Sequence, residues 1–450
     1  MEDRLSGIAQ QIRMERAGNV SARAVDPLRV FFSTMGCAKN EVDSSRMATL
    51  LTEVGCRIVD DPDSAECLIV NTCSFIQAAT EESIVAVLEL CGLPHVEKGD
   101  AKVIVAGCMP SRYGDDLAES LTEADQFVPC SSEDDIASIV DRLFPGRLGS
   151  TQLSLPLGEV SSYVKISEGC DRFCTFCTIP FIRGRYHSYS FGRIDSDVRT
   201  AIASGAREIV LIGQDTGRWG NDLREKGTLA QLLDRLATSY ADTWFRVMYV
   251  QPEGVSDELI EVIASHDNVA SYLDIPFQHS SPRILSAMNR RGSREMFLSL
   301  IERIRSRVPG VALRTTLIAG FPGETEEEFS ELCAFVEDAE LDYVGVFAYS
   351  REDGTRAARL PDQLDDEEKQ RRAMVLRDVA DALSSMVVSR HVGEDLTVLV
   401  EGVEEDGQRF GRAQCQAPDV DGVVYVPSGE VGSFEHVTIV DTLGYDMEGE

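Results

Sequence analysis

Three cysteines, Cys170, Cys174 and Cys177, stand close together in one short segment, which we call the cysteine loop. The loop follows residues 163–166, whose composition predicts a β-strand. Three thiolates at this spacing can bind one inorganic centre, and soft sulfur ligands favour iron–sulfur clusters, zinc or copper(I). A structural zinc site would need a fourth ligand such as the nearby His187, whereas a cubane held by three thiolates leaves one iron open. The loop therefore predicts a metal centre, and an open iron there could bind substrate.

Three further cysteines, the N-terminal cysteines Cys37, Cys73 and Cys108, each follow a β-rich run that ends in glycine or threonine. The runs are residues 30–32, 68–70 and 103–105. Helical stretches between them, residues 43–54 and 78–90, favour an open parallel α/β sheet, in which ligands gather at the carboxyl ends of the strands. We therefore expect the N-terminal cysteines to meet at one sheet edge. The other cysteines share no spacing and are interpreted as ordinary buried thiols: Cys56, Cys67, Cys91, Cys130, Cys333 and Cys415.

The middle of the chain predicts an open or incomplete parallel (β/α) barrel. Six strand candidates alternate there with helical stretches; they are residues 163–166, 208–212, 245–250, 271–275, 312–318 and 343–347. The active site of such a barrel lies over the carboxyl ends of its strands, where the cysteine loop is also expected.

Polar residues that follow these strands are expected to form a rim for a cofactor and substrate. They are Gln214, Asp215, Gln278, His279, Arg314 within the fifth strand, and residues 320–324 after it. The charged run 365–372 is interpreted as a solvated helical face without a site role.

The chain is long enough for about three domains. We predict a polar leader at residues 1–27, an N-terminal domain at 28–145, a proline- and glycine-rich linker at 144–158, a central domain at 155–387 and a C-terminal domain at 388–450. Short alternating strands at residues 396–400, 423–426 and 437–439 predict a small C-terminal β-barrel.

The charge of the chain argues against nucleic acid as a partner. There are 76 acidic and 43 basic side chains, a formal net charge of −33, which repels polyphosphates and attracts basic proteins. From Val388 to the end, fourteen acidic residues face three basic ones. The N-terminus lacks the pattern of a signal peptide, and no apolar run approaches the roughly 20 residues needed to span a membrane. Twelve cysteines in a chain of this length favour metal or catalysis in a reducing compartment, so we expect a soluble cytoplasmic protein.

The spacing of the cysteine loop, with Phe176 before its last cysteine, resembles the radical S-adenosylmethionine superfamily. The flanking residues 166–169 and 179–184 resemble its methylthiotransferase branch, as do residues 35–40, 71–76 and 107–109 around the N-terminal cysteines. The resemblance implies that Cys170, Cys174 and Cys177 hold a radical-generating 4Fe-4S cluster whose open iron binds S-adenosylmethionine. It implies a second 4Fe-4S cluster on Cys37, Cys73 and Cys108. Cofactor contacts are implied or expected at Phe176, Gly213, Gln214, Asp215, Gln278 and Arg314.

The C-terminal segment resembles a TRAM domain, a module that commonly binds RNA. The family divides between enzymes that methylthiolate a tRNA adenosine and those that modify a ribosomal protein, and the acidic C-terminal segment favours the protein. Residues 272–279, 344–350 and 417–426 also resemble the protein-modifying branch. The resemblance then implies a methylthio group added to the β-carbon of an aspartate in the twelfth small-subunit ribosomal protein, two molecules of S-adenosylmethionine per turnover, and flavodoxin or ferredoxin as reductant. A tRNA methylthiotransferase and a non-catalytic iron–sulfur sensor remain as alternatives.

Overall fold

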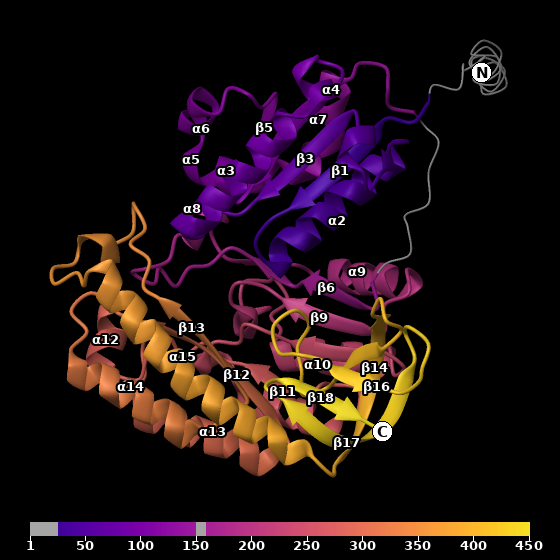
Figure 1. Cartoon of the computed structure of the whole chain (residues 1–450). Coiled ribbons are helices and arrows are strands. Elements are labelled where there is room, and N and C mark those ends of the chain that lie inside the picture. Colours follow the sequence, from indigo (N-terminus) through magenta and orange to yellow (C-terminus); the bar gives the residue numbers. More distant parts are fainter. Residues whose placement is uncertain (1–25, 150–158) are drawn as a thin grey trace, which may run out of the picture.

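The computed structural model describes residues 26–149 and 159–450 of the chain (Figure 1). It has three parts, an N-terminal sheet domain, a central partial barrel and a small C-terminal barrel packed beside the central one. The predicted fold class is confirmed. The predicted leader, apart from its last two residues, and the predicted linker beyond residue 149 lie outside the described residues.

The N-terminal domain contains five parallel strands in the order β2-β1-β3-β4-β5. Its central strand β3 (Cys67–Thr72) is buried along its whole length, because helices cover both faces of the sheet. The other strands are β1 (Arg29–Thr34), β2 (Arg57–Ile58), β4 (Lys102–Gly107) and β5 (Gln126–Pro129). The helices are α2 (Ala38–Glu53), α3 (Gln77–Cys91), α4 (Pro94–Glu97), α5 (Cys108–Tyr113), α6 (Asp115–Ser120) and α7 (Ile136–Leu143).

All six predicted strands of the central barrel are present. They are β6 (Ser161–Lys165), β9 (Glu208–Ile212), β10 (Trp244–Val247), β11 (Tyr272–Asp274), β12 (Ala312–Ala319) and β13 (Tyr343–Ala348). They form two parallel sheets, β10-β9-β6 and β11-β12-β13, which a bridge between Phe245 and Val269 joins. Within the described residues β13 does not pair with β6, so the barrel stays open on that side.

Helices pack on the outer face of these strands around one large apolar cluster that includes Leu211, Leu233 and Phe335. Two of them begin with a capping box at Thr228 or Thr325. The threonine side chain accepts a hydrogen bond from the backbone N–H three residues later, and the side chain of that residue accepts one from the threonine backbone N–H. The helices are α9 (Phe191–Ala203), α10 (Leu229–Ser239), α11 (Asp257–Ser265), α12 (Pro282–Ala287), α13 (Arg294–Arg307), α14 (Glu326–Ala339) and α15 (Asp366–Val388).

The C-terminal domain is a closed barrel of five strands in the order β14-β15-β16-β18-β17. Its core is continuous with side chains of the central barrel such as Val210 and Tyr272. The strands are β14 (Asp395–Val403), β15 (Arg409–Ala413), β16 (Val424–Val426), β17 (Phe434–Leu443) and β18 (Asp446–Gly449). The small β-barrel is confirmed, but the sequence did not predict β15 and β18, because both are short and rich in glycine and charge.

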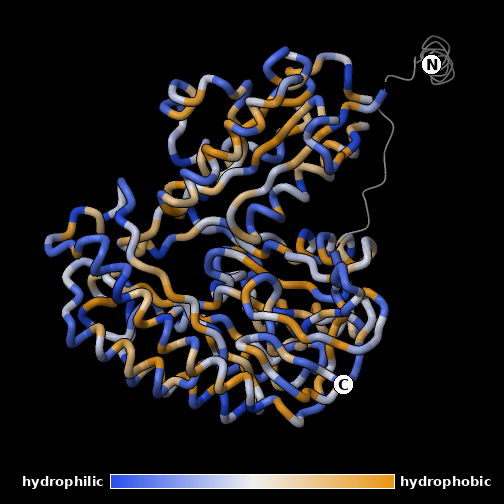
Figure 2. The backbone as a smooth tube through the Cα atoms, in the orientation of Figure 1, coloured by the Kyte–Doolittle hydropathy of each residue, from blue (hydrophilic) through white to orange (hydrophobic). Residues whose placement is uncertain are grey.

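Hydropathy follows this architecture. Figure 2 shows hydrophobic stretches running along the strands of the N-terminal sheet, whereas the outer helices of the central barrel alternate between hydrophilic and hydrophobic segments. Such alternation is typical of helices that bury one side only. Among the described residues, the helices are all too short or too polar to cross a membrane.

The charged run 365–372 forms the start of α15 and is solvated only in part. Lys369 and Arg372 are buried, and Arg372 donates to the Glu324 carboxylate at 2.8 Å. The prediction of a solvated face is therefore wrong for these two residues. The physical reason is that α15 packs against the segment after β12, so that one side of the helix turns inward.

Candidate functional site

The cysteine loop follows β6. Two short antiparallel strands of two residues each, β7 (Ser167–Glu168) and β8 (His187–Ser188), pair with each other at its two ends. Gly169, at the start of the loop, has a φ of +74°, and a Cβ there would lie 2.3 Å from the Arg185 backbone oxygen. Only glycine fits such a position, so the loop must leave β7 in this direction. The three cysteines are thereby held over the carboxyl end of β6, as the barrel topology predicts.

The thiols of the cysteine loop are all partly accessible. Burial raises the pKa of Cys170 and of Cys177, so a bound metal would have to displace their protons. The Arg290 guanidinium lies 3.9 Å from Cys174 Sγ and places a positive charge beside the loop. Three thiols with a neighbouring cation suit an anionic iron–sulfur centre.

The zinc alternative finds less support in this geometry. The ring of His187, its fourth ligand, stacks edge-on against Tyr189 with ring centroids 5.3 Å apart. In the part of the chain that the structure describes, no three His, Cys, Asp or Glu side chains are arranged to hold a single ion. The thiolates of a cubane need not converge so closely, because each binds a different iron.

The N-terminal cysteines Cys37, Cys73 and Cys108 follow β1, β3 and β4 and lie together at one edge of the sheet. The side-chain oxygen of Asn40 is 3.9 Å from Cys37 Sγ and 3.8 Å from Cys108 Sγ. A Cβ added to Gly36 would lie 2.9 Å from Cys73 Sγ. The three thiols are therefore neighbours, and their donor set suits an iron–sulfur cluster.

A buried ionic network connects Cys108 with residues on either side of the cysteine loop. Lys165 of β6 pairs with Glu168 at 2.5 Å and with Asp43 of α2. Arg183, which follows α8 (Ile179–Ile182), lies 2.5 Å from Asp43 and donates to Cys108 Sγ at 3.4 Å. Burial alone would raise the pKa of Glu168, but Lys165 and Arg183 lower it to about 2. The network thus stays ionised and ties the N-terminal sheet to the central barrel.

Five buried polar atoms just after the barrel strands have no hydrogen-bond partner among the described residues. They are Ser167 Oγ, Gln214 Oε1, Gln251 Oε1, Ser280 Oγ and Tyr349 Oη. Buried polar atoms are rarely left unpaired. Since these atoms follow five of the six strands, on the side of the cysteine loop, they fit a polar ligand such as S-adenosylmethionine.

Gln214 and Asp215, both predicted site residues, lie beside the cysteine loop. Gln214 Nε2 donates to Glu168 at 2.7 Å, and the fully buried Asp215 pairs with Arg172 of the loop at 2.6 Å. Burial raises the pKa of Asp215 although Arg172 opposes it. The two residues connect β9 to the loop.

Gly213, Phe176 and Gln278 also lie at this edge. A Cβ on Gly213 would lie 2.5 Å from Ser167 Oγ. Phe176 packs against a small apolar cluster that includes Met288. Gln278 is buried with a φ of +71°. Their contacts with a cofactor stay predictions.

His279 is fully buried and lies 3.2 Å from Glu324. Arg314 is placed differently from the expected rim. Its guanidinium lies 3.2 Å from Asp274 and 3.3 Å from Asp421 of the C-terminal barrel. It is the third residue of the eight-residue strand β12, well before the carboxyl end. These contacts assign Arg314 to the junction of the two barrels.

Sequence reasoning missed Asp43, Lys165, Arg183, Ser167 and Gln251. The last two could have been found as early polar residues after predicted strands, which is how Gln214 was found. The three charged residues carry no such pattern, because each pairs across a domain boundary. The proximity of Cys108, together with burial, raises the pKa of Cys130 well above the ordinary value, which suits an unreactive thiol, so its interpretation as an ordinary thiol stays a prediction.

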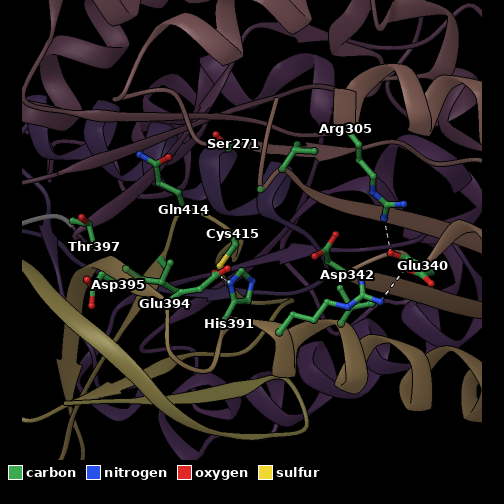
Figure 3. A pocket seen from close by; sticks show the side chains of 16 residues that line it. Ser271, Arg305, Glu340, Asp342, His391, Glu394, Asp395, Thr397, Gln414 and Cys415 are labelled. Atoms are coloured by element: carbon green, nitrogen blue, oxygen red, sulfur yellow. Dashed lines mark hydrogen bonds and ion pairs between the residues drawn. The ribbon is translucent and has the colours of Figure 1, made fainter. Parts of the chain in front are cut away.

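A cavity of about 660 Å³ lies on the opposite side of the barrel (Figure 3). Ser271 and Asp342 line it just before β11 and β13, so it opens at the amino ends of the strands. Charged groups in its wall pair with one another, as His391 does with Glu394 at 2.7 Å. None of the predicted site residues lines this cavity, which is therefore not the candidate cofactor site.

Comparison with known families divides the chain into three matched segments. Uncharacterized protein family UPF0004 matches residues 29–129, the Radical SAM superfamily matches residues 164–336, and the TRAM domain matches residues 392–450. The second match contains the cysteine loop, and the first contains the N-terminal cysteines.

Curated relatives match nearly the whole chain. The ribosomal protein uS12 methylthiotransferase RimO of Natranaerobius thermophilus is 39% identical over 94% of this chain and 99% of its own length. RimO of Clostridioides difficile is 38% identical over 94% and 98%. RimO of Symbiobacterium thermophilum is 40% identical over 94% and 91%.

Solved structures share the fold at low sequence identity. The radical S-adenosylmethionine methyltransferase TsrM of Kitasatospora setae, with cobalamin and a 4Fe-4S cluster bound, has a TM-score of 0.53 and 15% identity over 72% of this chain and 73% of that one. The cobalamin-dependent S-adenosylmethionine radical enzyme OxsB has a TM-score of 0.50 and 12% identity over 80% and 57%.

Proposed function

The chain belongs to the RimO family of ribosomal protein uS12 methylthiotransferases, and from this membership we propose that it adds a methylthio group to the β-carbon of an aspartate in that ribosomal protein. It is an enzyme that transfers sulfur-containing groups. We propose that it acts in the cytoplasm.

One observation carries the proposal: a buried ionic network links Cys108 of the N-terminal domain to Glu168 and Arg183, the residues on either side of the cysteine loop in the chain. Arg183 lies six residues after Cys177, yet its guanidinium donates to Cys108 Sγ at 3.4 Å. A group held by the N-terminal cysteines is thus close to the edge of the barrel where the cysteine loop lies. This proximity is what transfer of sulfur to a carbon activated in the barrel requires.

In the proposed enzyme, Cys170, Cys174 and Cys177 hold one 4Fe-4S cluster with an open iron for S-adenosylmethionine. Cys37, Cys73 and Cys108 hold a second. When bound, these groups would supply one-electron transfer from the reductant, radical chemistry at carbon and the sulfur to be inserted. Two molecules of S-adenosylmethionine are used per turnover, with flavodoxin or ferredoxin as reductant.

The residues of the chain bind and orient these groups. Ser167, Gln214, Gln251 and Tyr349 supply unpaired polar atoms for the cofactor, and in this proposal Phe176 contacts its adenine. Arg172 and Asp215 hold the cysteine loop against β9. Because Asp215 and Ser167 are fully buried, this part of the site is shielded from water.

The C-terminal barrel supports a protein rather than a tRNA substrate. Its three arginines already have partners: Arg390 pairs with Glu340, Arg409 donates to a backbone oxygen, and Arg412 pairs with Glu208 and Glu401. The acidic hairpin tip, which we define as Glu404, Glu405 and Asp406, is exposed. Such a surface suits a basic ribosomal protein and offers little to phosphate.

Mass spectrometry of small-subunit proteins, from cells with and without this chain, tests the proposal. A methylthio group on one aspartate of the ribosomal protein is expected only when the chain is present. Nucleoside analysis of bulk tRNA from the same cells is the counterpart, and a methylthiolated adenosine that depends on the chain would refute the choice of substrate. The alternative of a non-catalytic iron–sulfur sensor is tested separately: a sensor would not cleave S-adenosylmethionine to 5′-deoxyadenosine when reduced.

A further inference from the structure

Arg183 belongs to the central domain by sequence, but its guanidinium is surrounded by residues of the N-terminal domain. One terminal nitrogen donates to Asn40 Oδ1 at 2.6 Å and to Cys108 Sγ at 3.4 Å. The other lies 2.5 Å from Asp43. Only 2% of the Arg183 side chain is exposed to solvent. The guanidinium is therefore part of the N-terminal cysteine site itself.

The surrounding charges hold Arg183 in this place. Asp43 and Glu168 each contact both Arg183 and Lys165, so two carboxylates balance two cations in one buried set. Removing one member of such a set leaves an uncompensated buried charge, which is costly. The guanidinium is thus fixed, with one of its N–H groups directed at the Cys108 sulfur.

Within the described residues, no other lysine or arginine donates to a sulfur of Cys37, Cys73 or Cys108. A hydrogen bond from a cation to a thiolate stabilises extra negative charge on the group that the thiolate binds. Burial strengthens this effect, because the local dielectric is low. The reduction potential of an iron–sulfur cluster depends on its charge, on hydrogen bonds to its sulfurs and on its exposure.

We propose that Arg183 is a positioning residue that holds Cys108 and raises the reduction potential of the cluster on the N-terminal cysteines. The inference rests on the proposed function, in which these three cysteines bind a cluster. It adds a role for a residue of the central domain in setting the properties of a centre bound by the other domain.

The test uses the full chain with Cys170, Cys174 and Cys177 changed to alanine, so that only the N-terminal cluster remains. Redox titration followed by electron paramagnetic resonance gives its potential, and iron content is measured alongside. In Arg183→Gln we expect the equilibrium constant for one-electron reduction to fall at least about tenfold, which is a shift of about 59 mV to lower potential. Arg183→Lys keeps the charge but loses the forked geometry, so a smaller fall is expected.

Arg112→Gln is the matched control. Arg112 is also largely buried and bridges the same two domains, pairing with Glu352 at 2.8 Å, but it donates to the backbone oxygen of Ser74 and to no sulfur. We expect the reduction potential of the N-terminal cluster in Arg112→Gln to equal that of the parent. An equal fall in Arg112→Gln and Arg183→Gln would overturn the inference, because a loosened domain interface would then explain both.

The outcomes separate the inference from the function on which it rests. If the parent binds no iron, the N-terminal cluster does not exist, and both the inference and the proposed function are wrong. If the parent binds a cluster but Arg183→Gln leaves its potential unchanged, the inference is wrong while the proposed function stands. If Arg183→Gln cannot bind iron, Arg183→Lys decides: a potential below that of the parent supports the inference, and an equal potential overturns it.

Discussion

Arg412 joins the C-terminal barrel to the central barrel through a buried carboxylate. It pairs with Glu208 at 2.5 Å and Glu401 at 2.6 Å, and Glu208 also pairs with Arg246 at 2.8 Å. The Glu208 side chain has no exposed surface. Replacing Arg412 with methionine therefore leaves a fully buried carboxylate with one cation in place of two.

The structure sets the size of the expected loss. Burial alone would raise the pKa of Glu208, but Arg246 and Arg412 outweigh it and lower the pKa from 4.5 to about 2. At about 1.4 kcal/mol per pKa step, this lowering is worth about 3 kcal/mol of stability at neutral pH. Arg412→Met leaves Glu208 with one of its two cations, and removing one partner of a buried ion pair costs about 3 kcal/mol or more, so we expect a loss of about 3 kcal/mol.

Tryptophan fluorescence during urea unfolding measures this loss. The chain has two tryptophans, and Trp244 stacks on Phe434 across the junction with ring centroids 4.7 Å apart. In a Trp219→Phe background the signal then reports on the junction alone. Arg409→Met is the control, because Arg409 lies in the same strand and donates only to a backbone oxygen. Equal losses in the two variants would refute the reasoning.

The pH dependence of the loss has a definite sign. Because the folded pKa of Glu208 lies below the unfolded value of 4.5, its contribution is present above pH 4.5 and is lost as the pH falls toward 2. The difference in stability between the parent and Arg412→Met should therefore shrink from about pH 5 to about pH 3. A difference that stays constant over this range would show that Glu208 is not its source.

Three other predictions concern the clusters and the substrate. Changing the three cysteines of the cysteine loop to alanine should reduce iron from about eight to about four atoms per chain and abolish cleavage of S-adenosylmethionine; unchanged iron would contradict the assignment. Changing the N-terminal cysteines to alanine should leave that cleavage intact, measured as 5′-deoxyadenosine, but stop carbon–sulfur bond formation; normal product would exclude their role. Changing the three residues of the acidic hairpin tip to lysine should slow association with the basic ribosomal protein, measured by interferometry. The effect should be larger at 0.1 M than at 1 M salt, because salt shortens the Debye length from about 10 to about 3 Å. An equal effect of the change at both salt concentrations would contradict this prediction.

The sequence predicted those features that local pattern determines. The six proposed cysteine ligands were found because thiols at such spacing, or after successive parallel strands, have few other uses. The order of strands in the central barrel followed from alternating β and α stretches. Gln214 and Asp215 were found because they come directly after a strand of that barrel.

What the sequence could not show are pairs whose members lie far apart in the chain. Arg183 and Asp43 are separated by 140 residues and Lys165 and Asp43 by 122. Nothing near a buried arginine distinguishes it from a solvated one, because packing of a distant element decides its burial. Arg314 shows the related difficulty that one of its partners, Asp421, lies in another domain.

Buried or largely buried cations at both junctions of the central barrel have a shared consequence. Arg112 and Arg183 pair with carboxylates across the boundary to the N-terminal domain, and Arg314 and Arg412 pair across the boundary to the C-terminal barrel. Such pairs add little stability compared with apolar packing, but they are satisfied in only one relative placement of the domains. That placement brings Cys108 to the edge of the central barrel. An apolar pair in place of Asp43 and Arg183 could preserve stability yet would leave Cys108 without a positive neighbour, so stability and cluster potential are separable consequences of the same residues.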